Sequence, residues 1–117
     1  MESYRTLVAW QRAHKVVITA LGACDRHYHP RSAAIMGQLR RAAVSIEANI
    51  VEGYALRTPL LFRKHIRIAL GSAAETECLL RVCGELGYLP AEILKELLVL
   101  LDGTIRTLVG FVKKPVG

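Results

Sequence analysis

Apolar residues recur every three or four positions along most of this chain, which is the spacing of one face of an α-helix. In the first segment the row comprises Leu7, Trp10, His14, Val17, Leu21 and Cys24. We expect a first helix that has Ser3 as its N-cap and runs to about His27. The sequence HYHPRS then breaks the helix, with Pro30 as the stop signal.

The second apolar segment predicts a helix from about Ser32 to Tyr54. Ser32 is suited to cap its N-terminus, and Gly53 stands where a C′ glycine, which ends many helices, is expected. This helix is apolar over so much of its circumference that it needs neighbours on more than one side. One partner face in a bundle would not cover it. We therefore expect a subunit interface and a homo-oligomer.

Two further helices follow. Thr58-Pro59 is a start signal, an N-cap and then proline at the first helical position, and the third helix should extend to Leu86 before Gly87. The fourth opens after Leu89-Pro90 and ends near Lys113. Its apolar row is Leu94, Leu97, Leu98, Leu101, Ile105, Leu108 and Val112.

Short loops join the four helices, so each helix must lie antiparallel to its neighbours along the chain. We find no strand-like alternation of apolar and polar residues and no internal repeat. The predicted fold class is therefore all-α, an up-down-up-down four-helix bundle formed by one domain over residues 1–117.

A narrow polar stripe interrupts the apolar surface of the second helix. It consists of Gln38, Ser45, Asn49 and Glu52. Buried amides and carboxylates must be hydrogen-bonded, and such groups can fix the register between helices or subunits. We interpret the stripe as such a device, which sets the packing of the second helix together with Glu75 of the third.

Catalytic and metal chemistry find little support. Glu52 and Glu75 could form a carboxylate pair, but di-metal bundles need a histidine three residues after a glutamate, and no glutamate here has one. His27 and His29 beside Cys24 lack further ligands at metal-binding spacing. The chain has no glycine-rich phosphate loop. We expect no catalytic residue, metal or cofactor, and a small enzyme or metal protein is the weakest hypothesis.

Cysteine usage and hydropathy indicate the cellular compartment. The three cysteines form no CxxC pair, which favours buried thiols in a reducing compartment. We expect no signal peptide, because the N-terminal sequence has no basic region followed by an apolar core, and no membrane span, because the longest apolar run is too short. We expect a cytoplasmic protein that does not bind membranes.

The formal net charge of +6 makes a polyanion a reasonable partner. Seven basic residues and two acidic ones lie between Arg31 and Arg67. Lys and Arg on a helix face bind phosphates without reading base sequence. No aromatic residues alternate with them, so stacking on bases is not indicated. The alternative is a solvated basic face. The candidate nucleic-acid-binding residues are Arg40, Arg41, Arg57, Arg63, Lys64 and Arg67.

Several motifs together resemble a bacterial four-helix-bundle family, that of proteins encoded in intervening sequences of 23S ribosomal RNA genes. The motifs are QLRRAAVSIEANIVEG, then Arg57 and Phe62, then ALGSAAETE and LGYLP. The family pattern is matched by Ser45, Asn49, Glu52, Gly53, Gly71, Ser72 and Glu75. The accessory protein Avd of diversity-generating retroelements is a more distant relative, and the match is closer to the intervening-sequence branch.

The resemblance implies an antiparallel bundle that assembles into a homopentamer, and it brings no catalytic residue. The Avd branch implies a basic surface, nucleic-acid binding and association with a reverse transcriptase. We therefore expect a non-enzymatic oligomer that binds RNA or DNA through backbone phosphates. The alternative is a protein-interaction adaptor, for example an accessory subunit of a reverse transcriptase.

Overall fold

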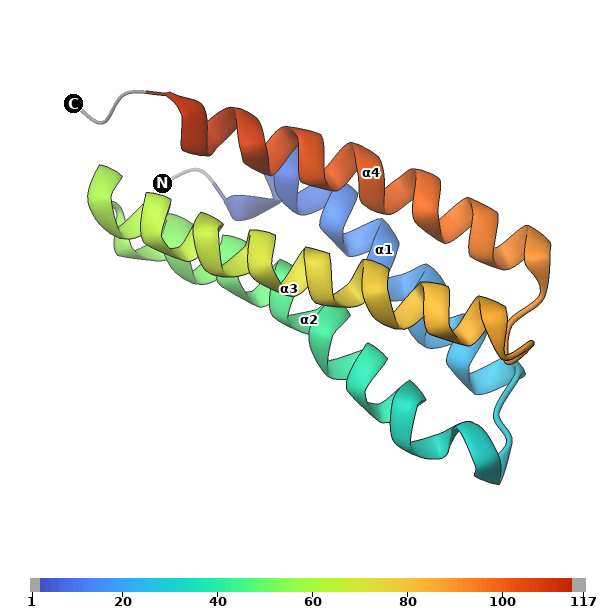
Figure 1. Ribbon diagram of the computed structural model, residues 1–117. Helices are drawn as coiled ribbons and strands as arrows, with labels where there is room; N and C mark the ends of the chain where they lie inside the picture. Colours follow the sequence, from blue (N-terminus) through green and yellow to red (C-terminus); the bar gives the residue numbers. More distant parts are fainter. Residues whose placement is uncertain (1–2, 115–117) are drawn as a thin grey trace.

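The computed structural model describes residues 3–114. Four helices run alternately up and down along a rod of 47 × 24 × 20 Å (Figure 1). They are α1 (Val8–Arg26), α2 (Ala33–Leu56), α3 (Pro59–Glu85) and α4 (Ala91–Lys113), with 3-10 turns η1 (Tyr4–Thr6) and η2 (Pro30–Ser32). No strand occurs in this part of the chain. The prediction of an all-α, up-down-up-down bundle is confirmed.

The helix boundaries follow most of the local signals. The Thr58 hydroxyl accepts a hydrogen bond from the Leu61 N–H at 3.2 Å, so Thr58-Pro59 starts α3 as predicted. Gly87 follows α3 with a φ of 72°, a left-handed conformation that favours glycine. Ser3 caps η1 and not α1, which begins at Val8. The Ser32 hydroxyl donates to the His29 carbonyl and gives α2 no side-chain cap.

The expectation that Gly53 ends the second helix is wrong. The helix continues to Leu56, and Arg57 takes the left-handed conformation with a φ of 63°. Gly53 is required for a different reason. A Cβ on Gly53 would lie 2.8 Å from the Cβ of His65 and 3.4 Å from the Cα of Phe62. Glycine therefore lets α2 and α3 approach more closely than any side chain would allow.

The core of α1 differs from the predicted row. Its fully buried positions are small residues, namely Ala9, Ala13, Val16, Ala20, Ala23 and Cys24. Leu7, Trp10 and Leu21 lie beside this stripe, partly buried against the core. Short side chains at the centre bring the backbones close, and larger ones then cover the edges. Burial raises the pKa of the thiols of Cys24 and Cys83, so both act as small apolar residues.

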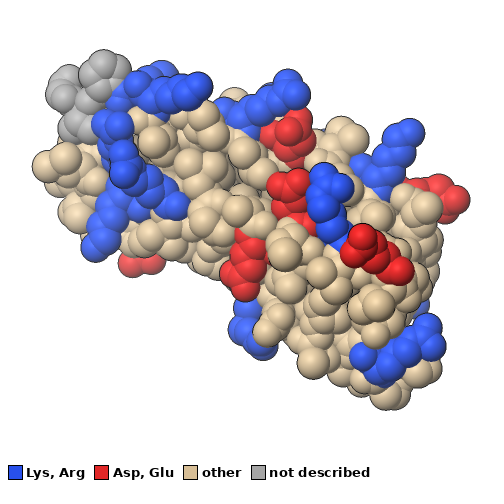
Figure 2. Space-filling model, viewed as in Figure 1, with Lys and Arg blue, Asp and Glu red and all other residues tan. Residues whose placement is uncertain are grey.

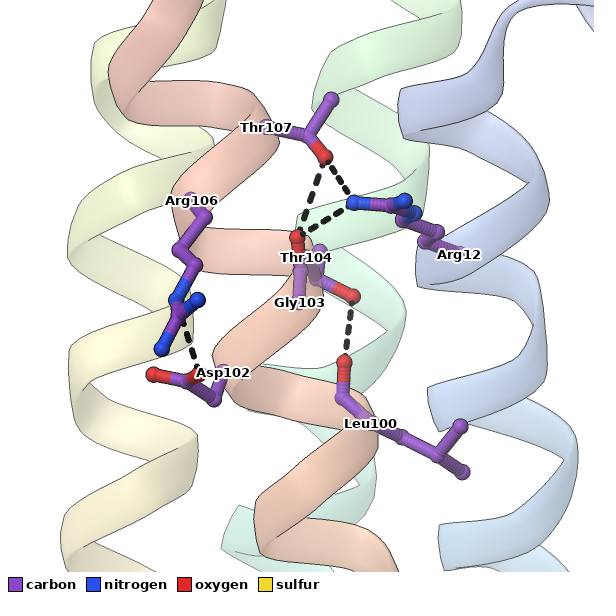
Figure 3. A network of polar contacts seen from close by, with 7 residues as sticks. All are labelled: Arg12, Leu100, Asp102, Gly103, Thr104, Arg106 and Thr107. Atoms are coloured by element: carbon purple, nitrogen blue, oxygen red, sulfur yellow. Dashed lines mark hydrogen bonds and ion pairs between the residues drawn. The ribbon is translucent and has the colours of Figure 1, made fainter.

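A polar contact joins the first and last helices. Arg12 of α1 reaches α4, where its guanidinium donates to the Thr107 hydroxyl at 2.7 Å and the Gly103 carbonyl at 3.1 Å (Figure 3). The Thr107 hydroxyl also donates to the Gly103 carbonyl at 3.0 Å. These hydrogen bonds tie α1 to α4.

We predict that Gly53→Ala destabilises the protein by about 1–3 kcal/mol, because the added methyl group forces α2 away from α3. Urea unfolding followed by circular dichroism measures the change. Gly110→Ala is the matched control, since nothing lies within 4 Å of a Cβ there. The control should be neutral or stabilise by up to about 1 kcal/mol. Equal effects of both variants would contradict the close-contact explanation.

Candidate functional site

A chain of hydrogen bonds joins α2 to α3 along the predicted polar stripe. The Ser45 and Ser72 hydroxyls lie 2.8 Å apart, and the Asn49 amide donates to the Ser45 carbonyl at 2.9 Å. The Asn49 side-chain oxygen and His65 Nδ1 lie 3.0 Å apart, and since the oxygen can only accept, His65 donates. Glu52 lies 4.0 Å from His65 Nε2. These polar groups therefore serve to hold the two helices in register.

Other residues of the expected motif lie outside this chain of bonds. Gln38, Gly71 and Glu75 are exposed. On α3 the stripe has two partners, Ser72 and His65. Ser72 belongs to the expected motif, whereas His65 does not. Nowhere in residues 3–114 do three His, Cys, Asp or Glu side chains converge into a group that could hold a metal ion. No helix in this range has the length and hydropathy that a membrane span requires.

Two of the six candidate phosphate-binding residues have partners within the bundle. Arg40 forms an ion pair with Asp25 of α1 at 2.6 Å, and this hydrogen bond raises the pKa of Arg40. Arg63 is half-buried and donates to the carbonyls of Val112 and Lys114 at 2.5 and 3.3 Å. It therefore ties the start of α3 to the C-terminal end of α4.

The structure separates the other candidates into two places. Ser45 lies level with Ser72, and Gly53 lies level with Phe62, so the start of α3 packs against the end of α2. Arg41 therefore lies roughly 18 Å along the rod from that end, at about 1.5 Å per helical residue. The exposed candidates at the α2–α3 end are Arg57, which follows α2, and Lys64 and Arg67, which lie in the first turns of α3.

Additional lysines join this end from a distant part of the sequence. The Arg63 contacts bring the end of α4 beside the start of α3, so Lys113 and Lys114 lie near Lys64. Lys and Arg side chains predominate at this end, and acidic and basic side chains intermix further along (Figure 2). We call Arg57, Lys64, Arg67, Lys113 and Lys114 the basic end. The sequence analysis did not include Lys113 and Lys114 among the candidates. The up-down-up-down topology could have indicated them, because it places the end of the fourth helix beside the start of the third.

An aromatic pocket lies within the basic end. Its volume is about 390 Å³, and its lining includes Tyr54, Phe62 and Phe111. The Phe62 and Phe111 rings meet edge to face, with centroids 5.3 Å apart. The Arg57 guanidinium lies over the Tyr54 ring at 5.8 Å. Tyr54 and Phe62 lie on either side of Arg57 in the sequence, so the expectation that no aromatic residues alternate with the basic ones is wrong. Only Phe111 comes from a distant part of the chain.

Comparison with known proteins agrees with this architecture. The family model described as 23S rRNA-intervening sequence protein matches residues 5–110. The chain belongs to this family.

The chain is also similar to the crystal structure of a protein of unknown function from the S23 ribosomal protein family of Bacteroides thetaiotaomicron. The TM-score is 0.82 and the identity 20%, over 92% of this chain and 100% of that one. No curated protein matches significantly. The structural likeness supports the fold, and the resemblance of the motifs to the 23S rRNA intervening-sequence family is confirmed.

We predict that Asn49→Ala lowers the free energy of unfolding by about 1–3 kcal/mol, because it leaves the His65 donor without its acceptor. Urea titration measures this change. Gln38→Ala on the same stripe is the control, since the exposed Gln38 should contribute less than about 0.5 kcal/mol. A neutral Asn49→Ala would show that the polar chain does not stabilise the α2–α3 contact.

Proposed function

We propose that this protein is a non-enzymatic homo-oligomer that binds RNA or DNA through phosphate contacts at the basic end. The observation that carries the proposal is the clustering of exposed cations from two helices at one end of the rod. Arg57 belongs to the α2–α3 turn, Lys64 and Arg67 to α3, and Lys113 and Lys114 to the end of α4. Two segments of the chain thus contribute to one positive surface.

The charges that remain exposed suit a phosphate backbone. Lys64 and Arg67 make no ion pair with any described residue, in contrast to Arg40 with Asp25. Exposed, unpaired cations release counterions when phosphates replace them, and this supplies affinity without base specificity. Groups that might have carried acid–base chemistry, such as His65, are bonded within the α2–α3 seam. These features support a binding role over catalysis.

The outer face of α2 supports self-association. Val44, Ala48 and Val51 line a groove of about 430 Å³ that Glu47 and Glu52 flank. Val44 is 43% exposed, although valine is a residue that proteins usually bury. The strip fits the expectation from the sequence that the second helix has a neighbour beyond its partners in the bundle. The family resemblance implies a pentamer for the assembly.

The phosphate proposal predicts a steep dependence of affinity on salt. Lys64→Ala combined with Arg67→Ala should reduce the slope of log K against log salt by about 1.4–1.8, because each lost phosphate contact removes about 0.7–0.9. Filter binding at several salt concentrations measures the slope. Lys95→Ala, on an exposed residue outside the basic end, should leave it unchanged. Absence of binding to RNA and DNA at low salt would refute the proposal.

The assembly proposal predicts that Val44→Glu gives monomers, because it places a charge in the apolar strip. Light scattering of the purified protein measures the mass of the oligomer. Val99→Glu is the matched control, since Val99 is 65% exposed on α4 and should leave the mass of the oligomer unchanged. A monomeric mass for the unaltered protein, or an unchanged mass for Val44→Glu, would contradict this interface.

A further inference from the structure

The aromatic pocket of the basic end is built by contacts that involve three helices. Arg63 holds the C-terminal carbonyl groups of α4, and this places Phe111 edge to face against Phe62. Gly53 and Tyr54 close the pocket from α2. A side chain at position 53 would collide with α3, so glycine brings Tyr54 and Phe62 into one site. The result is an apolar pocket beside the cations of the basic end.

A cation lies close to each of two rings that line this pocket. The Arg57 guanidinium lies 5.8 Å from the centre of the Tyr54 ring, and the Lys114 ammonium lies 5.5 Å from that of Phe111. Among the described residues that line the pocket, none is acidic. A ligand in the pocket therefore meets flat aromatic and aliphatic surfaces, with positive charge at the rim. If an apolar side chain of another protein occupied the pocket, it would pack against the rings but would leave the cations without an anionic partner.

We propose that this pocket takes an unpaired nucleobase of single-stranded nucleic acid, while Arg57 and Lys114 hold the adjoining phosphates. The inference rests on the proposed phosphate-binding function and names the form of nucleic acid. The volume of the pocket, about 390 Å³, falls within the usual range for small-molecule sites, about 300–1,000 Å³. Bases stack on aromatic side chains largely regardless of sequence, since every base has a π-face.

This arrangement distinguishes single strands from duplexes. Within a duplex the bases are stacked on one another and cannot enter a protein pocket without being unpaired. A duplex thus contacts the cations alone, whereas a single strand contacts the cations and the rings. The basic end should prefer unpaired RNA or DNA, with an affinity that falls if the bases are removed.

The first test uses the unaltered protein. Fluorescence anisotropy measures the affinity of the protein for three oligonucleotides: a short single strand, the corresponding duplex, and a strand of the same length with abasic sugars. The single strand and the duplex are compared as RNA and as DNA. We expect the single strand to bind about 5- to 150-fold more tightly than the abasic strand, which corresponds to the contribution of one stacked base. Equal affinities for the normal and abasic strands would overturn the inference and leave the phosphate-binding proposal intact.

The second test alters the pocket. Tyr54→Leu keeps apolar volume and removes one aromatic ring, so single-strand affinity should fall by about 5- to 150-fold while duplex affinity stays within twofold. Tyr28→Leu is the control, since Tyr28 is 58% exposed between α1 and α2, at the opposite end of the rod. Circular dichroism verifies folding.

Two other outcomes of these experiments would overturn the inference. If Tyr54→Leu lowers the oligomer mass by light scattering and leaves single-strand affinity unchanged, a second copy of the chain occupies the pocket. If neither strand nor duplex binds at low salt, the phosphate-binding proposal fails as well. The abasic comparison separates these cases, because it requires no altered protein.

Discussion

The close approach of α2 to α3 at Gly53 is the constraint on which the rest of this structure depends. Position 53 has no room for a side chain, because a Cβ there would lie 2.8 Å from that of His65. One turn away, His65 and Asn49 are hydrogen-bonded, and the two serine hydroxyls continue the seam. Apolar packing alone is non-directional. The glycine contact and the polar seam fix which residues of the two helices lie level with each other.

That register decides which charges are available to a partner. Arg63 faces the end of α4 and is used to cap its carbonyls, whereas Lys64 and Arg67 stay exposed. Arg40 is paired with Asp25 at a distance along the rod from them. A stretch of sequence that looks evenly basic is thus divided by the fold into structural arginines and free cations. Charge counts along the chain cannot make this division, since it depends on contacts with α1 and α4.

The sequence predicted the four helices and their antiparallel order, because these depend on local patterns such as Thr58-Pro59 and Gly87 and on the short loops between helices. It predicted the wrong role for Gly53, because a helix-ending glycine and a glycine at a close contact look alike in sequence. It also misjudged the core face of α1, where alanines lie innermost. The aromatic pocket could not be predicted, since Tyr54 and Phe111 meet only through tertiary packing.

Photo-crosslinking to a single-stranded oligonucleotide, with the linked peptides identified by mass spectrometry, tests the central claim most directly. The claim is that one end of the rod, built by the α2–α3 register, receives nucleic acid. We expect crosslinks in residues 53–67 and 107–114, including Tyr54 or Phe111, and loss of these crosslinks in high salt. Crosslinks concentrated at the opposite end, in residues 27–35 and 84–92, would contradict the account.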